Sequence, residues 1–297
     1  MAQINFILWL QSFRSPLLDA FFTVVNATAE DNFITALAVI IFWCVDPLVG
    51  LRFLLPLLFS GYLNTFLKDL FHTPRLTAEQ VRFMAVPPDG SYAFPSGHTQ
   101  NAAVLWSYLA GHYRRWPLIV AAVILIPLVG LSRIYRGAHW PVDVLGGMAI
   151  GIGLVWLALT IYRFWDRRSL SLPLWGQLAL GVAVPLVLFA AYPKNSMQTG
   201  TALGMVTGFA LERRYVGFPV RVPLWKQVLK VLIGLAVLVA LQMLLPQLFP
   251  VGPAFRFTRY ALIGLWGTLG APFVFRAIFG SEEAASNPTQ MHADSRR

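Results

Sequence analysis

Three short clusters of polar side chains interrupt an otherwise apolar sequence, and together they contain the groups that phosphoryl transfer requires. That chemistry depends mostly on positioning and on charge stabilisation, so it needs cations, backbone donors and an activated nucleophile. Each cluster adjoins the end of an apolar run. The clusters are Lys68 with Arg75; Pro95-Ser96-Gly97-His98; and Ser132-Arg133 followed by His139 and Asp143.

Five residues of these clusters are suited to holding a phosphate group. Lys68, Arg75 and Arg133 can neutralise the non-bridging oxygens, the arginines as forked donors and the lysine as a point charge. Ser96 and Gly97 open an apolar run, where backbone N–H groups at a helix N-terminus point at a bound anion. We therefore predict that these five residues bind phosphate.

Three further residues of the clusters supply acid–base and nucleophilic groups. His139 and Asp143 are four positions apart, so in a helix they share one face. The carboxylate can then hold one ring nitrogen as a donor and leave the other nitrogen to attack phosphorus. His98 remains as a general acid for the leaving oxygen. This assignment makes His139, His98 and Asp143 catalytic and requires no metal or cofactor.

The composition predicts a membrane protein. Of 297 residues, 57% are hydrophobic and 12% are charged, about half the usual charged fraction, and the mean hydropathy is +0.63. These values exclude a disordered or fibrous protein and argue against a water-soluble one. The single cysteine, Cys44, lies in an apolar run, which excludes a disulfide framework. The predicted spans lie near 32–48, 51–67, 99–113, 117–132, 142–162, 174–192, 199–211, 228–248 and 258–279.

These runs predict an all-α polytopic membrane helix bundle of about nine spans. Residues 1–30 carry apolar side chains at helical spacing, which favours interfacial helices. The catalytic core would occupy 31–165, additional transmembrane helices 166–280, and a polar tail 281–297. The short run 199–211 has glycines at four-residue intervals, suited to close helix packing, but it is also compatible with a re-entrant or interfacial segment.

The positions of the basic residues predict the orientation. The formal net charge is +10, and most of it falls in the turns near 113–117, 162–173 and 211–227, which the positive-inside rule places in the cytoplasm. The net charge thus reflects topology, and nucleic acid is not an expected partner. Lys68, Arg75 and Arg133 fall on the opposite side, where a bound phosphate would explain their presence.

The three clusters closely resemble the signature of the type 2 phosphatidic acid phosphatase superfamily, the membrane lipid phosphate phosphatases. That signature is Lys-x6-Arg-Pro, then Pro-Ser-Gly-His, then Ser-Arg-x5-His-x3-Asp. The second and third blocks match in full, whereas Leu76 stands where the family has proline and Pro74 precedes Arg75. The resemblance covers roughly residues 50–163 and implies a six-helix core, which the helices after residue 166 extend.

The resemblance implies that His139 forms a phospho-histidine with Asp143 as its partner. His98 would protonate the leaving group and then activate the hydrolytic water, while Lys68, Arg75, Ser96, Gly97, His98 and Arg133 bind the phosphate. It also implies metal-independent hydrolysis of a lipid phosphate or diphosphate at the extracytoplasmic face, with the protein in a bacterial inner or plasma membrane.

Several activities remain compatible with these residues. Undecaprenyl diphosphate, phosphatidic acid, phosphatidylglycerophosphate and a sphingoid-base phosphate all suit the predicted site. The predicted outside N-terminus and nine spans are similar to the layout of glucose-6-phosphatases and sphingosine-phosphate phosphatases. A phosphotransferase would pass the same phosphoryl group to an acceptor alcohol. A transporter or scaffold on a phosphatase-like core is the non-enzymatic alternative, and the intact chemical residues argue against it.

Overall fold

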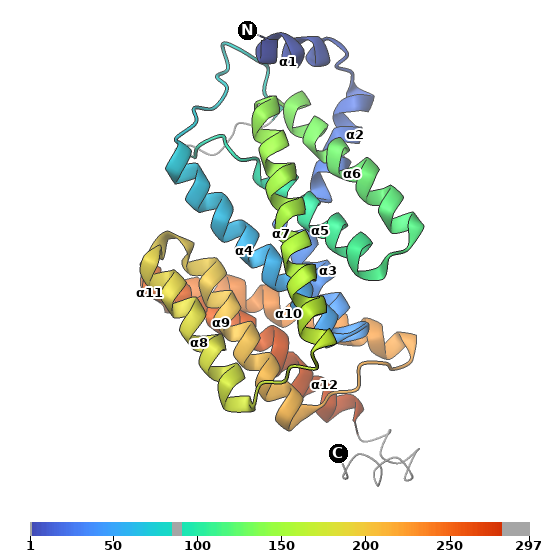
Figure 1. The fold of residues 1–297 in the computed structure, drawn as a ribbon, viewed down its shortest axis with the longest axis vertical. Coiled ribbons are helices and arrows are strands. Elements are labelled where there is room, and N and C mark those ends of the chain that lie inside the picture. Colours follow the sequence, from blue (N-terminus) through green and yellow to red (C-terminus); the bar gives the residue numbers. More distant parts are fainter. Residues whose placement is uncertain (1, 85–90, 281–297) are drawn as a thin grey trace. The chain divides into compact units, whose positions relative to one another are not determined.

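The computed structural model describes residues 2–84 and 91–280, and all regular structure in these residues is helical (Figure 1). The prediction of an all-α fold is therefore confirmed. The α-helices are α1 (Ala2–Ser12), α2 (Pro16–Ala27), α3 (Asp31–Cys44), α4 (Pro47–Phe71), α5 (Gly97–Tyr113), α6 (Trp116–Tyr135), α7 (Pro141–Arg167), α8 (Leu174–Ala191), α9 (Ser196–Leu211), α10 (Leu224–Leu248), α11 (Pro253–Leu265) and α12 (Ala271–Phe279). A 3-10 turn covers Pro193–Asn195, and π-helical segments cover Glu212–Val216 and Trp266–Gly270.

The chain divides into two compact units. The N-terminal unit comprises residues 1–37 and 53–170, and the C-terminal unit comprises residues 38–52 and 171–297. Residues 38–52 lie within the predicted catalytic core but group with the C-terminal unit. Trp43 explains this grouping, because its indole Nε1 donates to the carbonyl of Gly267 at 2.8 Å and its own carbonyl accepts from the Lys230 ammonium at 2.8 Å.

Six described helices are long and apolar enough to cross a membrane, namely α4, α6, α7, α8, α10 and the continuous stretch Pro253–Phe279. The pair α2 and α3, bent by 45°, adds a seventh candidate. The predicted interfacial region 1–30 therefore contains a helix that continues, through a bend, into the first predicted span. The predicted total of nine spans remains a prediction, and the predicted tail 281–297 lies outside the described residues.

Small residues bring α5 and α7 close together in the N-terminal unit. A Cβ atom at Gly147 would lie 2.6 Å from the carbonyl oxygen of Ser96, and one at Gly151 would lie 2.7 Å from that of Gln100. Any side chain at these two positions would push the helices apart. The two glycines thus hold the start of α7 against the start of α5, where the second and third polar clusters lie.

The glycines of α9 serve the same purpose in the C-terminal unit. A Cβ atom at Gly200 or Gly204 would overlap the backbone carbonyl of Phe257 or Ala261, both in α11. The predicted small-residue face therefore packs α9 directly on α11, and α9 itself is a regular 16-residue helix.

Candidate active site

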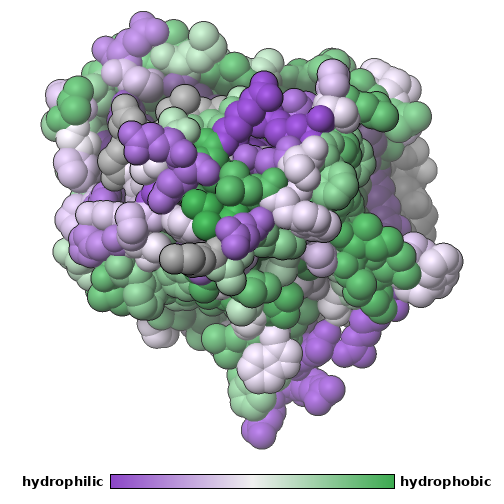
Figure 2. All heavy atoms as spheres, turned by 90° about the horizontal axis from the view of Figure 1, so that it is seen from above, coloured by the Kyte–Doolittle hydropathy of each residue, from purple (hydrophilic) through white to green (hydrophobic). Residues whose placement is uncertain are grey.

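The three polar clusters meet at one end of the helices in the N-terminal unit. They lie at the C-terminal ends of α4 and α6, at the N-terminal ends of α5 and α7, and in the loops between them. Figure 2 looks onto this end of the unit, where hydrophilic side chains gather among hydrophobic ones. The opposite ends of α5, α6 and α7 carry a separate basic group: Arg114, Arg115, Arg163, Arg167 and Arg168.

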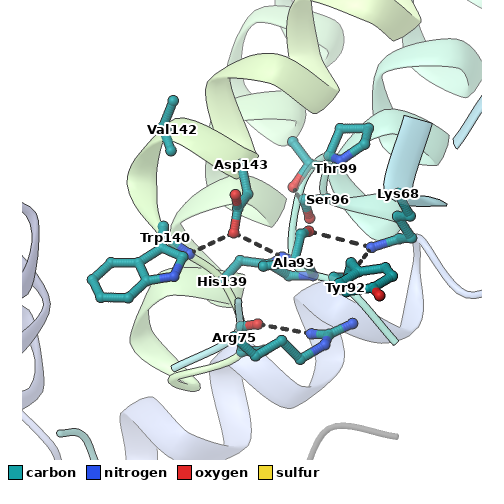
Figure 3. A network of polar contacts seen from close by, with 12 residues as sticks. Lys68, Arg75, Tyr92, Ala93, Ser96, Thr99, His139, Trp140, Val142 and Asp143 are labelled. Atoms are coloured by element: carbon teal, nitrogen blue, oxygen red, sulfur yellow. Dashed lines mark hydrogen bonds and ion pairs between the residues drawn. The ribbon is translucent and has the colours of Figure 1, made fainter. Parts of the chain in front are cut away.

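A histidine–carboxylate pair occupies the start of α7 (Figure 3). The Nδ1 atom of His139 lies 3.3 Å from Oδ2 of Asp143, and the same oxygen accepts the backbone N–H of Trp140 at 2.9 Å. His139 is 3% exposed and Asp143 is fully buried. Pro141 begins the helix at a position that needs no backbone donor, so Asp143 falls at the third helical position and reaches back to Trp140. This geometry lets the carboxylate fix Nδ1 of His139 as the donor and leaves Nε2 unprotonated.

Backbone carbonyl groups before the second cluster hold two of the three predicted cations. The ammonium of Lys68 donates to the carbonyls of Tyr92 at 2.7 Å and Ala93 at 3.2 Å. The guanidinium of Arg75 donates to the carbonyl of Ser91 at 2.8 Å and, from its other branch, to that of Ala138 at 3.0 Å. Arg75 therefore connects the loop before α5 with the residue preceding His139. Figure 3 shows the ammonium of Lys68 directed at Tyr92 and Ala93.

Ser96 connects the second cluster to the third. Its backbone N–H donates to the carbonyl of Asp143 at 3.0 Å, and its buried hydroxyl lies 2.9 Å from that of Thr99. The N–H of Ser96 is thus already engaged. The N–H groups of Gly97 and His98 follow in the first turn of α5, where backbone donors have no acceptor within the helix. These two groups are better placed than that of Ser96 to donate to an anion.

The first cluster departs from the family pattern at Leu76, and the structure gives that residue a packing role. Leu76 is 4% exposed and belongs to a buried cluster with Ile7, Val81, Ile134 and Val144. The carbonyl of Pro74 accepts the indole N–H of Trp140 at 3.0 Å. The loop around Arg75 is therefore fixed by apolar packing on one side and by the start of α7 on the other.

Asn26 is a site residue that sequence reasoning missed. It is 4% exposed, and its Oδ1 accepts a hydrogen bond from Nη1 of Arg133 at 2.5 Å, while its Nδ2 donates to Glu30 at 3.2 Å. A signal exists in the sequence, because Asp19, Thr23, Asn26 and Glu30 are spaced as one face of a helix in an otherwise apolar segment. The first three contact α6 or the residue after it, through Tyr135, Arg136 and Arg133 respectively.

The cations and burial act together on the two histidines. Burial lowers the pKa of His139 well below its usual value, and the charges of Arg133, Lys68 and Arg75 lower it further. The pKa of His98 is lowered to about 3, first by burial and then by Arg133. Both imidazoles are therefore neutral at pH 7, and the predicted site residues other than Gly97 belong to one electrostatic and hydrogen-bonded group.

Metal-binding side chains are not grouped in the described part of the chain. Within residues 2–84 and 91–280, no three or more His, Cys, Asp or Glu side chains lie together in a way that could hold a metal ion. The groups available at the site are two imidazoles, one carboxylate and three cations.

Two family descriptions match the chain. Residues 49–167 match the PAP2 superfamily, and residues 196–283 match the transmembrane extension of PAP2 superfamily phosphatases. The first range contains every predicted site residue. The second covers most of the helices of the C-terminal unit, so these helices are a recognised companion of the phosphatase core.

Three curated relatives illustrate the similarity. Lipid phosphate phosphatase delta of Arabidopsis thaliana is 28% identical over 236 residues, which cover 69% of this chain and 55% of that protein. Phosphatidylglycerophosphatase B of Bacillus subtilis is 32% identical over 160 residues, which cover 48% of this chain and 75% of that protein. Human sphingosine-1-phosphate phosphatase 2 is 28% identical over 171 residues, which cover 56% of this chain and 42% of that protein.

The chain thus spans about half the length of the plant and human relatives. The bacterial relative is covered over three quarters of its length at 32% identity, and the two family descriptions agree with it. The expectation drawn from the three polar clusters is confirmed: this chain belongs to the PAP2 superfamily of phosphatases, and it is an integral membrane protein.

Proposed function

We propose that this protein hydrolyses a phosphate or diphosphate monoester of a membrane lipid through a phospho-histidine formed on His139. The observation that carries the proposal is the buried pair in which Asp143 lies 3.3 Å from Nδ1 of His139, next to three cations. A neutral imidazole whose Nδ1 is held as a donor presents the lone pair of Nε2 as a nucleophile.

The reaction would proceed in two displacements. Nε2 of His139 attacks phosphorus, the bond from phosphorus to the lipid oxygen breaks, and the leaving oxygen takes a proton from His98. Water then attacks phosphorus while His98 accepts the water proton; the phosphorus–nitrogen bond breaks, its electron pair returns to Nε2 of His139, and inorganic phosphate leaves. Lys68, Arg75 and Arg133 stabilise the charge on the non-bridging oxygens in both steps.

His98 has a pKa suited to a general acid only when phosphate is bound. Burial and cations lower that pKa to about 3. A phosphate dianion held by the same cations carries the opposite charge, so its binding would raise the pKa and favour the protonated imidazole. Substrate binding would thereby create the general acid in the place where it is used.

The proposed location is the extracytoplasmic face of a bacterial inner or plasma membrane. Support comes from the five arginines at the far ends of α5, α6 and α7, because basic residues near membrane helices favour the cytoplasm. The catalytic ends of the same helices would then face outward.

The substrate class is proposed from chemistry and from the relatives. The names of the relatives specify lipid phosphates, phosphatidylglycerophosphate and sphingosine 1-phosphate. All carry a terminal phosphate monoester on an apolar lipid. Undecaprenyl diphosphate and phosphatidic acid likewise combine a terminal phosphate group with apolar chains. A phosphotransferase would use the same phospho-histidine but pass it to an acceptor alcohol.

A substrate panel tests the proposal. Purified protein is assayed for phosphate release from these lipid mono- and diphosphates in excess chelator, with the His139→Ala protein as blank. His112→Ala, at the far end of α5, is the matched histidine control. We expect release by the wild type and the control but not by the blank. No release from any substrate, or equal release by the blank, would contradict the proposal, whereas phosphorylated acceptor in place of free phosphate would identify a transferase.

A further inference from the structure

A cationic cavity, separate from the candidate active site, lies entirely within the C-terminal unit, which contains none of the predicted site residues. It has a volume of about 550 Å³ and is bordered by the end of α10, by the start of α11 and by the turn between α8 and α9. Three cationic side chains line it: Lys194, Arg256 and Arg259.

Among the residues that the structure describes, none of those lining this cavity is acidic. Within residues 38–52 and 171–280, the acidic residues are Asp46 and Glu212 alone. Asp46 accepts backbone N–H groups at the start of α4, and Glu212 accepts the backbone N–H of Phe218. Neither carboxylate lines the cavity, so Arg256 and Arg259 face no carboxylate among its described lining residues.

The backbone adds further positive potential. The first residues of two helices, Ser196 of α9 and Pro253 of α11, line the cavity. The N-terminal end of a helix carries a partial positive charge, although the N–H of Ser196 itself donates to the carbonyl of Pro193. Two such ends beside three cations form an anion-binding arrangement.

Arg259 supplies an independent sign that a ligand is expected. Its Nε atom is buried and has no hydrogen-bond partner among the described residues. A buried guanidinium N–H without an acceptor is costly, and an anion in the cavity would supply one. Arg256 is held beside it, with its guanidinium carbon 6.0 Å from the ring centre of Tyr260, which also lines the cavity.

The apolar part of the lining indicates an amphiphile. Leu241, Leu245 and Ile263 line the cavity together with the cations. Since α10 and the stretch beginning with α11 are candidate membrane spans, these leucines and this isoleucine belong to helices that meet lipid. We propose that the cavity binds an anionic phospholipid, with its phosphate between Arg256 and Arg259 and its chains along α10.

The positions of the basic residues within the C-terminal unit also support an anion-binding site at the cavity. The basic loop after α9, with Arg213, Arg214 and Arg221, lies at the opposite ends of α9 and α10 from the cavity. The positive-inside rule assigns that loop to the cytoplasm and so leaves the cavity cations unexplained by topology. A bound anionic headgroup explains them.

Thermal unfolding of the full-length protein in detergent tests the proposal. A ligand that binds the folded state raises the melting temperature, and the stabilisation grows with the logarithm of ligand concentration over Kd. We expect dioleoylphosphatidylglycerol to raise it and dioleoylphosphatidylcholine to leave it unchanged. In Arg256→Gln/Arg259→Gln the apparent affinity for phosphatidylglycerol should fall by about tenfold to thirtyfold, since each basic group near a membrane surface contributes on the order of a factor of five.

Matched variants make the result specific. Arg213→Gln/Arg221→Gln removes the same charge at the other end of the unit and should keep the wild-type shift. Arg256→Lys/Arg259→Lys keeps the charge and should retain most of the binding. A shift lost in Lys68→Ala but kept in Arg256→Gln/Arg259→Gln would assign the lipid to the histidine site and overturn the proposal. An equal shift with sn-glycerol 3-phosphate would identify a soluble phosphate ligand and overturn the assignment to a lipid, as would the absence of any shift.

Discussion

The guanidinium of Arg133 donates a hydrogen bond to Oδ1 of Asn26, a residue 107 positions earlier in the chain. The amide group of Asn26 is in turn held by Glu30 at 3.2 Å. Arg133 is one of the cations that act on His139, so the N-terminal helix α2 determines where that charge lies. Asn26 is therefore a positioning residue that acts through Arg133.

Asn26→Ala should lower kcat/KM by about tenfold to hundredfold, because a hydrogen bond to a charged group contributes roughly 1.5–3 kcal/mol. Asn26→Asp keeps an acceptor for Arg133 and should restore most of the activity. Steady-state kinetics and vanadate affinity check this together with thermal unfolding. A loss of stability with unchanged kcat/KM would mean that Asn26 serves only the packing of α2.

Replacement of a cation should weaken transition-state stabilisation more than folding. For Lys68→Ala and Arg133→Ala we expect losses of roughly 2–4 kcal/mol each in kcat/KM, the range seen when one donor to a developing oxyanion is removed. Arg75→Lys keeps the charge but cannot reach both Ser91 and Ala138 as a forked donor, so it should also lose activity. Kinetics at matched protein stability measure these effects, and full activity in Lys68→Ala would remove Lys68 from the site.

Phosphate binding should be coupled to proton uptake by His98. The pKa of His98 is lowered to about 3, so at pH 7 the imidazole is neutral, and a bound phosphate would raise that pKa. Affinity should therefore rise as the pH falls below 7, beyond the change due to phosphate itself. Calorimetry in buffers of different ionisation enthalpy measures the protons taken up. His98→Gln should take up fewer protons than the wild type, and identical uptake would show that His98 is not the group that titrates.

The orientation can be tested with single introduced cysteines in a Cys44→Ala background. Glu79 is exposed in the loop that follows Arg75, and Arg167 is exposed at the far end of α7. In intact cells, a membrane-impermeant maleimide should label Glu79→Cys directly. Arg167→Cys should be labelled only after permeabilisation. The reverse pattern would place the catalytic end in the cytoplasm.

The grouping of the predicted site residues could be inferred from sequence because their spacing follows helix ends. His139 and Asp143 are one helical turn apart, and Pro141 between them predicts the start of α7, as observed. The eight predicted residues come together because the C-terminal ends of α4 and α6 and the N-terminal ends of α5 and α7 lie at one end of the N-terminal unit. Apolar runs likewise predicted most helices within a few residues of their ends.

Other features left weaker signals. The carbonyls of residues 91–93 accept hydrogen bonds from Lys68 and Arg75. Every residue type has a backbone carbonyl, so the sequence could not predict these contacts. The role of Asn26 was not predicted, because the polar face of its helix is equally typical of a helix that lies at the membrane interface. The cationic cavity of the C-terminal unit is lined by residues more than 60 positions apart, from Lys194 to Tyr260, and tertiary packing of α9 on α11 is needed to bring them together.

The most direct test of the central claim is trapping of the phospho-enzyme on His139. A phosphohistidine is stable to alkali and labile to acid, so rapid mixing with ³²P-labelled lipid phosphate and an alkaline quench preserves it. The wild type should show label that alkali retains and acid releases. His139→Ala should show neither label nor phosphate release, and Asp143→Asn should form the label at least a hundredfold more slowly. Phosphate release by His139→Ala at the wild-type rate would contradict the proposed nucleophile.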